Sequence, residues 1–227
     1  WDIVRNPRSL PLLVCGVINF PVYFAVQNIV GKKFLEDFAG LSSKLAATFL
    51  LAMMVTGAVS TFAGGFLPRL LGHRRKPILI GAAALVLAGS LVLLSGVRLQ
   101  APGWVLLAGY LLLAAATGSG PASLSTMKEL NRADAVAQSI AVVNCVTYVG
   151  VACMAWAGGA VLDQFAAVAV RTAGGVVYPA AAYANLFALS AGLALVSLAA
   201  SCFVRETRGE PVGPVAGASP LSGRTSG

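Results

Sequence analysis

Charged residues are scarce in this sequence of 227 residues. Only 11% of the residues are Asp, Glu, Lys or Arg, and 58% are hydrophobic, whereas a soluble domain usually carries about 25% charged residues. The mean hydropathy of +0.83 agrees with this imbalance. The composition therefore disfavours a water-soluble fold and predicts an integral membrane protein, with the lipid bilayer as its main partner.

Histidine is almost absent, and cysteine is rare. The single histidine, His73, lies in a link between apolar runs, and the four cysteines lie inside apolar runs without CxxC or Cys/His spacing. Such cysteines are typically small buried hydrophobes, so we predict no metal site, no cofactor and no disulfide. Ser119 stands in a Gly-Ser-Gly sequence that suggests a nucleophile, but no intramembrane base is available to activate it. We expect no catalytic residue and no enzyme activity.

Ionisable residues are also missing from the centres of the long hydrophobic runs. These runs are near 20 residues long, and a helix of that length crosses the roughly 30 Å hydrocarbon core. We therefore predict an all-α membrane protein with six transmembrane helices in residues 1–204, followed by a disordered cytoplasmic tail, residues 205–227, that is rich in Gly, Pro and Ser. The predicted spans are Leu10 to Val30, Leu45 to Leu67, Ile78 to Val97, Trp104 to Met127, Ala137 to Leu162 and Ala180 to Val204.

The net charge of +8 comes from basic residues in short links. No basic or aromatic face is present that could follow a phosphate backbone, so we expect no nucleic-acid partner. Eleven of the sixteen Lys and Arg residues fall at the termini and in the even-numbered links, and five fall in the other links. By the positive-inside rule, this asymmetry predicts that both termini are cytoplasmic.

Uncharged polar residues concentrate in the first and fourth predicted spans. Asn19, Tyr23 and Gln27 follow one another at four-residue spacing, which places them on one helix face. Pro21 can bend the first span, and the run from Thr117 to Pro121 loosens the fourth. We expect both helices to be bent beside a water-filled cavity, although such side chains can also hydrogen-bond between packed helices. The predicted solute pathway comprises Asn19, Tyr23, Gln27, Thr117, Ser119 and Asn144.

Polarity falls from the first to the third span and again from the fourth to the sixth. The second and fifth spans contain glycines that permit close packing, whereas the third and sixth contain few polar residues and are predicted to be the outer, lipid-facing helices. This repetition favours two related groups of three helices, a 3+3 repeat, as in transporter halves.

The link between the second and third spans carries a recognisable motif. From Gly65 to Lys76 it reads Gly-Phe-Leu-Pro-Arg-Leu-Leu-Gly-His-Arg-Arg-Lys, which resembles the Gly-x-x-x-Asp-Arg-x-Gly-Arg-Arg signature of the major facilitator superfamily. The acid is missing: Arg69, or Pro68 after a shift by one, stands in its place. The same link is also explained as a basic turn that obeys the positive-inside rule. The gating loop implied by the resemblance comprises Gly65, Arg69, Gly72, Arg74, Arg75 and Lys76.

Two later segments are similar to the same family. Lys128 to Arg132 resembles the link before the eleventh helix of bacterial members, and Arg205 to Gly209 resembles the Pro-Glu-Thr-Lys-Gly ending of sugar-porter relatives without its proline. The first resemblance continues through Asn144, Gly150, Gly158, Gly159 and Asp163.

Together these segments resemble the C-terminal six helices of a twelve-helix transporter. The resemblance implies half of a secondary active transporter, a symporter or antiporter in the plasma (inner) membrane, that moves a small solute by alternating access. Its partner would be a second six-helix half, from the same gene or another chain. The alternative is a non-transporting membrane module that serves as an interaction scaffold.

Overall fold

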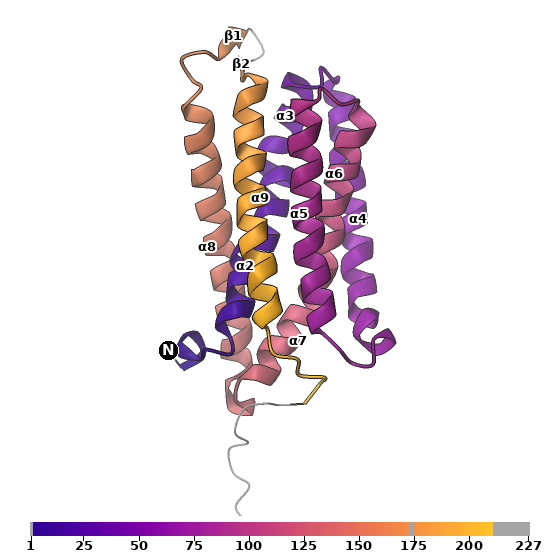
Figure 1. Cartoon of the computed structure of the whole chain (residues 1–227), viewed down its shortest axis with the longest axis vertical. Coiled ribbons are helices and arrows are strands. Elements are labelled where there is room, and N and C mark those ends of the chain that lie inside the picture. Colours follow the sequence, from indigo (N-terminus) through magenta and orange to yellow (C-terminus); the bar gives the residue numbers. More distant parts are fainter. Residues whose placement is uncertain (1, 173–174, 211–227) are drawn as a thin grey trace, which may run out of the picture.

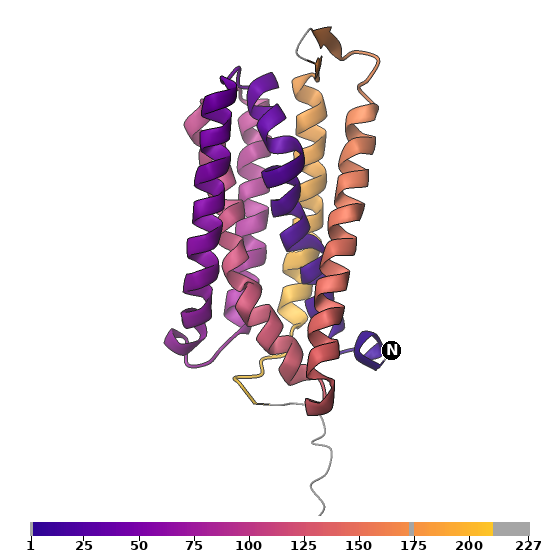
Figure 2. The ribbon, with the colours of Figure 1, turned by 180° about the vertical axis from the view of Figure 1, so that it is seen from behind.

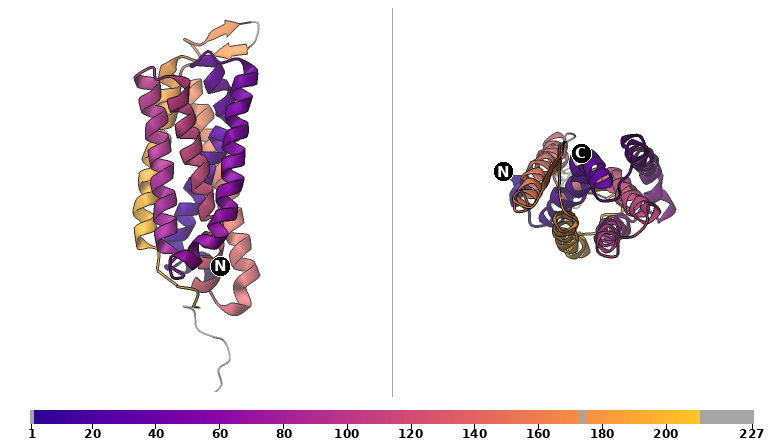
Figure 3. Two further views of the ribbon diagram at one scale, coloured as in Figure 1. Left: turned by 90° about the vertical axis from the view of Figure 1, so that its right-hand side faces the viewer. Right: turned by 90° about the horizontal axis from the view of Figure 1, so that it is seen from above.

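The computed structural model describes residues 2–172 and 175–210. They form a bundle of upright helices with a small hairpin projecting past one end (Figures 1 and 3). Six helical segments are long and apolar enough to cross a membrane, which confirms the predicted all-α membrane protein with six spans. They are Leu10–Asp37, Ser43–Leu70, Lys76–Arg98, Gly103–Leu130, Val136–Asp163 and Ala180–Phe203.

The links after the second and fourth spans and both described ends of the chain lie together at one end of the bundle (Figure 1). Helix α1 (Asp2–Arg5) and the link between helices α4 (Ser43–Leu70) and α5 (Lys76–Arg98) are found there. At the opposite end, strands β1 (Val170–Thr172) and β2 (Gly175–Val177) pair antiparallel. An even number of spans produces this arrangement. We refer to the end that carries α1 as the inner end and to the hairpin end as the outer end.

The first span is not a continuous α-helix. It runs as α2 (Leu10–Ala25), a π-helical turn η1 (Val26–Val30) and α3 (Gly31–Asp37). The hydroxyl group of Tyr110 donates a 2.8 Å hydrogen bond to the carbonyl oxygen of Gly31, directly after the π turn. Such π turns are uncommon and are found frequently at functional sites.

The fourth span is interrupted as well. It consists of α6 (Gly103–Ala115), a 3₁₀ turn η2 (Ala116–Ser119) and α7 (Gly120–Leu130). The 3₁₀ turn begins one residue before Thr117, where the sequence predicts a loosened backbone. Both predicted irregular helices are therefore irregular, and each changes its winding near the middle of the membrane span.

The two least buried spans are α4 and α8 (Val136–Asp163). Only 17% of the central window of each is buried, compared with 44% in α5 and 39% in α9 (Ala180–Phe203). Within this chain, α5 and α9 are thus more buried than α4 and α8, and the expectation that the third and sixth spans face lipid in the complete assembly stays a prediction. Helices α5 and α9 pack along each other, and both carry small side chains, such as Ala83 and Ala194, that are 0% exposed. Apolar composition alone does not separate a lipid contact from a packed helix.

Glycines allow two pairs of elements to approach closely, α4 with η2 and α8 with α2. A Cβ atom on Gly64 of α4 would overlap the backbone carbonyl group of Gly118 in η2, and one on Gly150 of α8 would lie 2.5 Å from the carbonyl oxygen of Val17 in α2. These positions have no space for any side chain. The glycine-mediated packing expected for the second and fifth spans is therefore present on one side of each helix.

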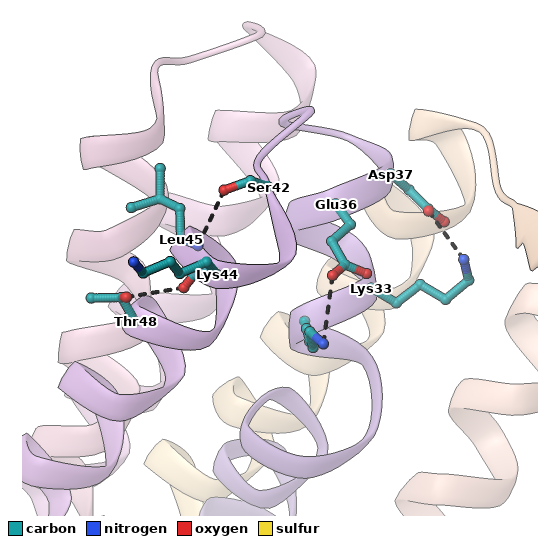
Figure 4. A network of polar contacts seen from close by, with 8 residues as sticks. Lys33, Glu36, Asp37, Ser42, Lys44, Leu45 and Thr48 are labelled. Carbon is teal, nitrogen blue, oxygen red and sulfur yellow. Dashed lines mark hydrogen bonds and ion pairs between the residues drawn. The ribbon is translucent and has the colours of Figure 1, made fainter. Parts of the chain in front are cut away.

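A buried carboxylate holds the outer end together. The side chain of Asp37 is 6% exposed and accepts a 3.0 Å bond from Lys33 Nζ. It also accepts a 2.8 Å bond from the Tyr183 hydroxyl group and a 3.2 Å bond from the Tyr178 backbone N–H. Figure 4 shows Lys33 reaching Asp37, and beside them Ser42, whose hydroxyl group caps the start of α4. The contacts of Asp37 fix the end of α3 to the start of α9.

Residues 205–210 continue from α9 and lie against the inner end of the bundle. The ordered chain thus extends into the segment that was predicted to be a disordered tail. Residues 211–227, the rest of that predicted tail, lie outside the described residues.

Candidate functional site

A pocket of about 230 Å³, open on one side, lies at the level of the η2 turn, with Asn144 and Tyr148 exposed at its edge. Its walls come from α2, from η2 and the start of α7, and from α8, with Leu79 contributed by α5. Segments separated by more than 100 residues are therefore brought to one site. The lining residues are Cys15, Gly16, Asn19, Phe20, Tyr23, Leu79, Ala116, Thr117, Ser119, Gly120, Ser123, Leu124, Val143, Asn144, Thr147 and Tyr148.

Five of the six residues predicted to line a solute pathway are among them. Asn19, Tyr23, Thr117, Ser119 and Asn144 meet at this cavity although they come from three different spans. Sequence reasoning did not single out Ser123, Thr147 and Tyr148, which complete the polar wall. The signal was available, because Ser123 follows Ser119 and Thr147 and Tyr148 follow Asn144 at helical spacing of three or four residues.

Gln27 is the exception among the predicted residues and does not line the cavity. Its Nε2 donates a 3.2 Å hydrogen bond to the carbonyl oxygen of Leu50 in α4. Its Oε1 is buried and makes no hydrogen bond to the described part of the chain. Gln27 is the second residue of the π turn, so the α-helical spacing that would align it with Asn19 and Tyr23 does not hold there.

The polar groups of the cavity are only partly used within the protein. Asn19 Oδ1 accepts a 2.7 Å hydrogen bond from the Ser197 hydroxyl group. The hydroxyl groups of Thr117 and Ser119 donate to carbonyl oxygens three residues earlier, at 2.7 and 2.9 Å. The Thr117 oxygen also accepts a 3.3 Å hydrogen bond from the Thr61 hydroxyl group, whereas the Ser119 oxygen can still accept. To the described residues, the side chain of Asn144 makes no hydrogen bond. The same is true, within residues 2–172 and 175–210, of the side chains of Ser123 and Thr147.

Aromatic rings form one side of the cavity wall. The Phe20 ring lies 5.9 Å from that of Tyr23 and 6.3 Å, edge to face, from that of Tyr148. These distances are typical of favourable aromatic pairs. Of the lining residues, all of which are described, none is acidic or basic. The arrangement can therefore bind through hydrogen bonds and apolar contact but not through charge.

A second polar cluster lies at the inner end. Arg75, which precedes α5, forms an ion pair with Glu129 near the end of α7, and both side chains are 13–14% exposed. The Glu206 carboxylate accepts hydrogen bonds of 2.9 and 3.1 Å from the backbone N–H groups of Arg75 and Lys76. We call Arg75, Lys76, Glu129 and Glu206 the inner clasp. It joins the links after the second and fourth spans to the segment after the sixth.

Electrostatics favour the ionised form of Glu206. Partial burial alone would raise the pKa of its carboxyl group, but backbone N–H donors of Arg75, Lys76, Arg208 and Thr207 outweigh burial and lower the pKa below its ordinary value of 4.5. The charge also sits at the N-terminus of α5, where a helix dipole stabilises an anion.

The other residues of the predicted gating loop are not part of the clasp. Arg69 and Arg74 are exposed, and Gly65 has open space around its Cα atom. Gly72 adopts a left-handed backbone conformation with φ of 61°, which favours glycine in this turn. Two acids from other segments, Glu129 and Glu206, contact Arg75 in this loop. Both lie in the segments that carry the later family resemblances, but nothing in the sequence pairs them with Arg75.

The cavity lies between the two most exposed helices. Helix α4 packs on α6, η2 and α7, and α8 packs on α2, so α4 and α8 stand at the two edges of the face seen in Figure 2. Both carry large exposed hydrophobic side chains, which are Leu45, Leu51, Met54, Val55, Val59, Phe62, Phe66, Leu67 and Leu70 on α4 and Tyr148, Val149 and Trp156 on α8. Polar Asn144 and Thr61 are also exposed on these helices.

No model of a known protein family and no curated protein matches this sequence. The resemblance to the major facilitator superfamily therefore rests on the loop motifs alone. Among the described residues, no group of three or more His, Cys, Asp and Glu side chains could hold a metal ion.

Proposed function

We propose that this chain is one half of a secondary transporter that moves a small solute across the membrane by alternating access. The observation that carries the proposal is the cavity lined with free hydrogen-bonding groups inside a membrane-spanning bundle. Lipid does not satisfy polar groups, so such groups persist where they face water, a solute or protein. The irregular turns η1 and η2 near the cavity fit a membrane binding site built on discontinuous helices.

The partner in this proposal is a second six-helix unit that covers the face between α4 and α8. That face has apolar edges and a polar centre with Asn144, so it needs a cover that supplies apolar contact at the sides and leaves room in the middle. Lipid alone would leave Asn144 and Thr61 facing hydrocarbon. The 3+3 relation between the two sets of three helices and the kinship with the major facilitator superfamily belong to the same proposal.

The inner clasp supplies the gating element. Its ion pair lacks an aligned hydrogen bond, and buried Arg75 Nε and Glu129 Oε2 bond to no described residue. Buried polar atoms without partners are costly, typically by about 1–3 kcal/mol. We infer that these groups exchange partners between inward-closed and inward-open states. In this proposal the membrane is the plasma (inner) membrane, and the positive-inside rule favours a cytoplasmic side for the clasp and both chain ends because the links there are basic.

The experiment is thiol accessibility from both sides of the membrane. The four native cysteines are replaced by serine, and a single cysteine is placed at Ser119 in the full chain. A charged, membrane-impermeant methanethiosulfonate is applied to right-side-out and inverted vesicles. We expect labelling from both sides, because the cavity opens alternately. A cysteine at Ser190, which is 1% exposed on α9 and outside the cavity lining, is the matched control and should stay unlabelled.

Two outcomes would contradict the proposal. Labelling of the Ser119→Cys protein from one side alone would indicate a fixed crevice without alternating access. Absence of labelling from both sides, with the protein folded, would indicate a sealed bundle and favour the non-transporting scaffold.

A further inference from the structure

We propose that a second copy of this chain covers the face between α4 and α8, related to the first by a two-fold axis parallel to the helices. This inference rests on the proposed function and names its second six-helix unit. Helices α4 and α8 stand at opposite edges of one face (Figure 2), so a two-fold axis through the middle of that face packs α4 of each copy against α8 of the other. The partner copy also covers the open side of the pocket, where Asn144 and Tyr148 are exposed.

Helices α4 and α8 match in length and run in opposite directions. Each contains 28 residues. Helix α4 begins at the outer end and α8 ends there (Figure 2). Because every residue adds 1.5 Å to both helices, each residue counted from the start of α4 has a counterpart at the same height, counted back from the end of α8. The two edges therefore correspond along their whole length.

Opposite charges lie at the outer ends of these two helices. Lys44 is exposed in the first turn of α4, and Asp163 is the exposed last residue of α8. Each lies at the helix end whose dipole disfavours its charge, and neither helix carries a compensating charge in that turn. Among residues 2–172 and 175–210, neither side chain has an ion-pair partner. A two-fold pair brings Lys44 of each copy to Asp163 of the partner copy, so the two charges compensate each other twice.

Side-chain size is complementary along the same register. When Lys44 and Asp163 share a level, three large exposed side chains of α4 lie at the heights of small exposed side chains of α8. Small residues let membrane helices approach closely. At the levels of Leu51 and Val59, α8 carries Trp156 and Tyr148, which pack beside these side chains. The large and small partners are Met54 with Cys153, Phe62 with Cys145 and Phe66 with Ala141.

These features favour a second copy over the other covers of this face. Lipid tails cover the large side chains of α4 but provide no opposite charge for Lys44 or Asp163. An unrelated six-helix chain would need an acid opposite Lys44, a base opposite Asp163 and small residues opposite α4. This chain already carries the complementary residues at its own second edge.

The first experiment measures disulfide cross-linking between copies of the purified full chain in liposomes. Cys153 is kept, the other three native cysteines are replaced by serine, and Met54→Cys is added. We expect oxidation with copper phenanthroline to give a covalent dimer, because a disulfide needs Cα atoms less than about 7 Å apart. The matched controls carry only one of the two cysteines. Each control alone should remain monomeric, whereas the two controls reconstituted together should form the dimer.

Charge reversal tests the outer-end contact. Lys44→Glu should weaken pairing by about 2–10-fold, because it replaces an attraction with a repulsion, and adding Asp163→Lys should restore it. Energy transfer between labelled copies at increasing lipid-to-protein ratios measures the pairing. Arg98→Glu makes the same change of charge at the exposed outer end of α5, on the opposite side of the bundle (Figure 1), and should leave pairing unchanged.

The proposal is overturned if the chain with both cysteines stays monomeric while its circular dichroism shows a folded helical protein. It is also overturned if either single-cysteine control cross-links as readily, or if Arg98→Glu weakens pairing as much as Lys44→Glu does. A covalent dimer without two-sided labelling at Ser119 would support the second copy and reject alternating access. Two-sided labelling of a chain that stays monomeric would support alternating access and reject the second copy.

Discussion

Glu206 shows how much a single side chain contributes to the inner end. Its carboxylate satisfies backbone N–H groups that the first turn of α5 would otherwise leave without partners. Helix α5 has no side-chain cap of its own at Arg75. A residue 131 positions away along the chain thus completes the start of a membrane helix.

We expect Glu206→Gln to lower the melting temperature at neutral pH. The folded-state pKa of Glu206 is lowered, so its contribution is fully present above the ordinary value and is lost as pH falls through the folded-state pKa, below 4.5. The difference between the two proteins should therefore shrink in acid. Melting curves across pH measure this, with Glu210→Gln as the control. A difference that grows as pH falls would refute the assignment.

Asn19 and Ser197 form the best-defined polar contact between the cavity wall and α9. A double-mutant cycle of Asn19→Ala and Ser197→Ala should give a coupling free energy of about 0.6–1.7 kcal/mol, the range found for hydrogen bonds between membrane helices. Denaturation of the four proteins measures it. Coupling near zero would mean that the bond contributes no stability.

The same residues refine what sequence alone could assign. Asn19 and Tyr23 reach the cavity because α2 is a regular helix up to Ala25. Gln27 does not, because a π turn is decided by packing, here by Leu50 and Tyr110, and leaves no mark in a spacing rule. In a transport assay of the proposed twelve-helix assembly, Asn19→Ala should therefore raise the apparent substrate constant more than Gln27→Ala does.

At the scale of the element, the sequence predicted where the helices lie along the chain. It did not predict which helices pack against one another. Long apolar runs determine where the six spans lie, and the Thr117–Pro121 run marks the irregular part of the fourth. Pro21 lies in the regular part of α2, before the π turn that begins at Val26. The order of burial was not predictable, since Ala, Ser and Gly suit lipid contact and tight packing equally. The hairpin Val170–Val177 is too short for its alternation of side chains to stand out.

Two neighbouring glycines of α4 test the close approach to η2. Gly64→Ala places a Cβ atom against the backbone of Gly118, whereas Gly65→Ala meets nothing within 4 Å. We expect Gly64→Ala to lower the melting temperature by several degrees or to prevent folding. Gly65→Ala should be neutral or slightly stabilising, since alanine is favoured over glycine in helices by up to about 1 kcal/mol. Equal effects of the two substitutions would show that α4 does not approach η2 this closely.

At the scale of the whole molecule, both ends of the described chain lie at the inner end of the bundle (Figure 1). The side of the membrane to which this end belongs is a prediction from the positive-inside rule. We expect tags or cysteines near Arg75, Arg132 and the C-terminus to report the cytoplasm, and those near Glu36, Arg98 and Arg171 to report the opposite side. Side-specific labelling in intact and inverted vesicles measures this. Finding Arg75 and Glu36 on the same side would refute the six-span arrangement.

The inner clasp also sets an order of events during biosynthesis. Arg75 leaves the ribosome long before Glu206, and at about 5–20 residues per second the 131 residues between them take roughly 7–26 s to synthesise. Throughout that interval the N-terminus of α5 lacks its carboxylate, and water has to satisfy the backbone N–H groups of its first turn. The clasp can therefore close only after the segment that follows the sixth helix has been synthesised.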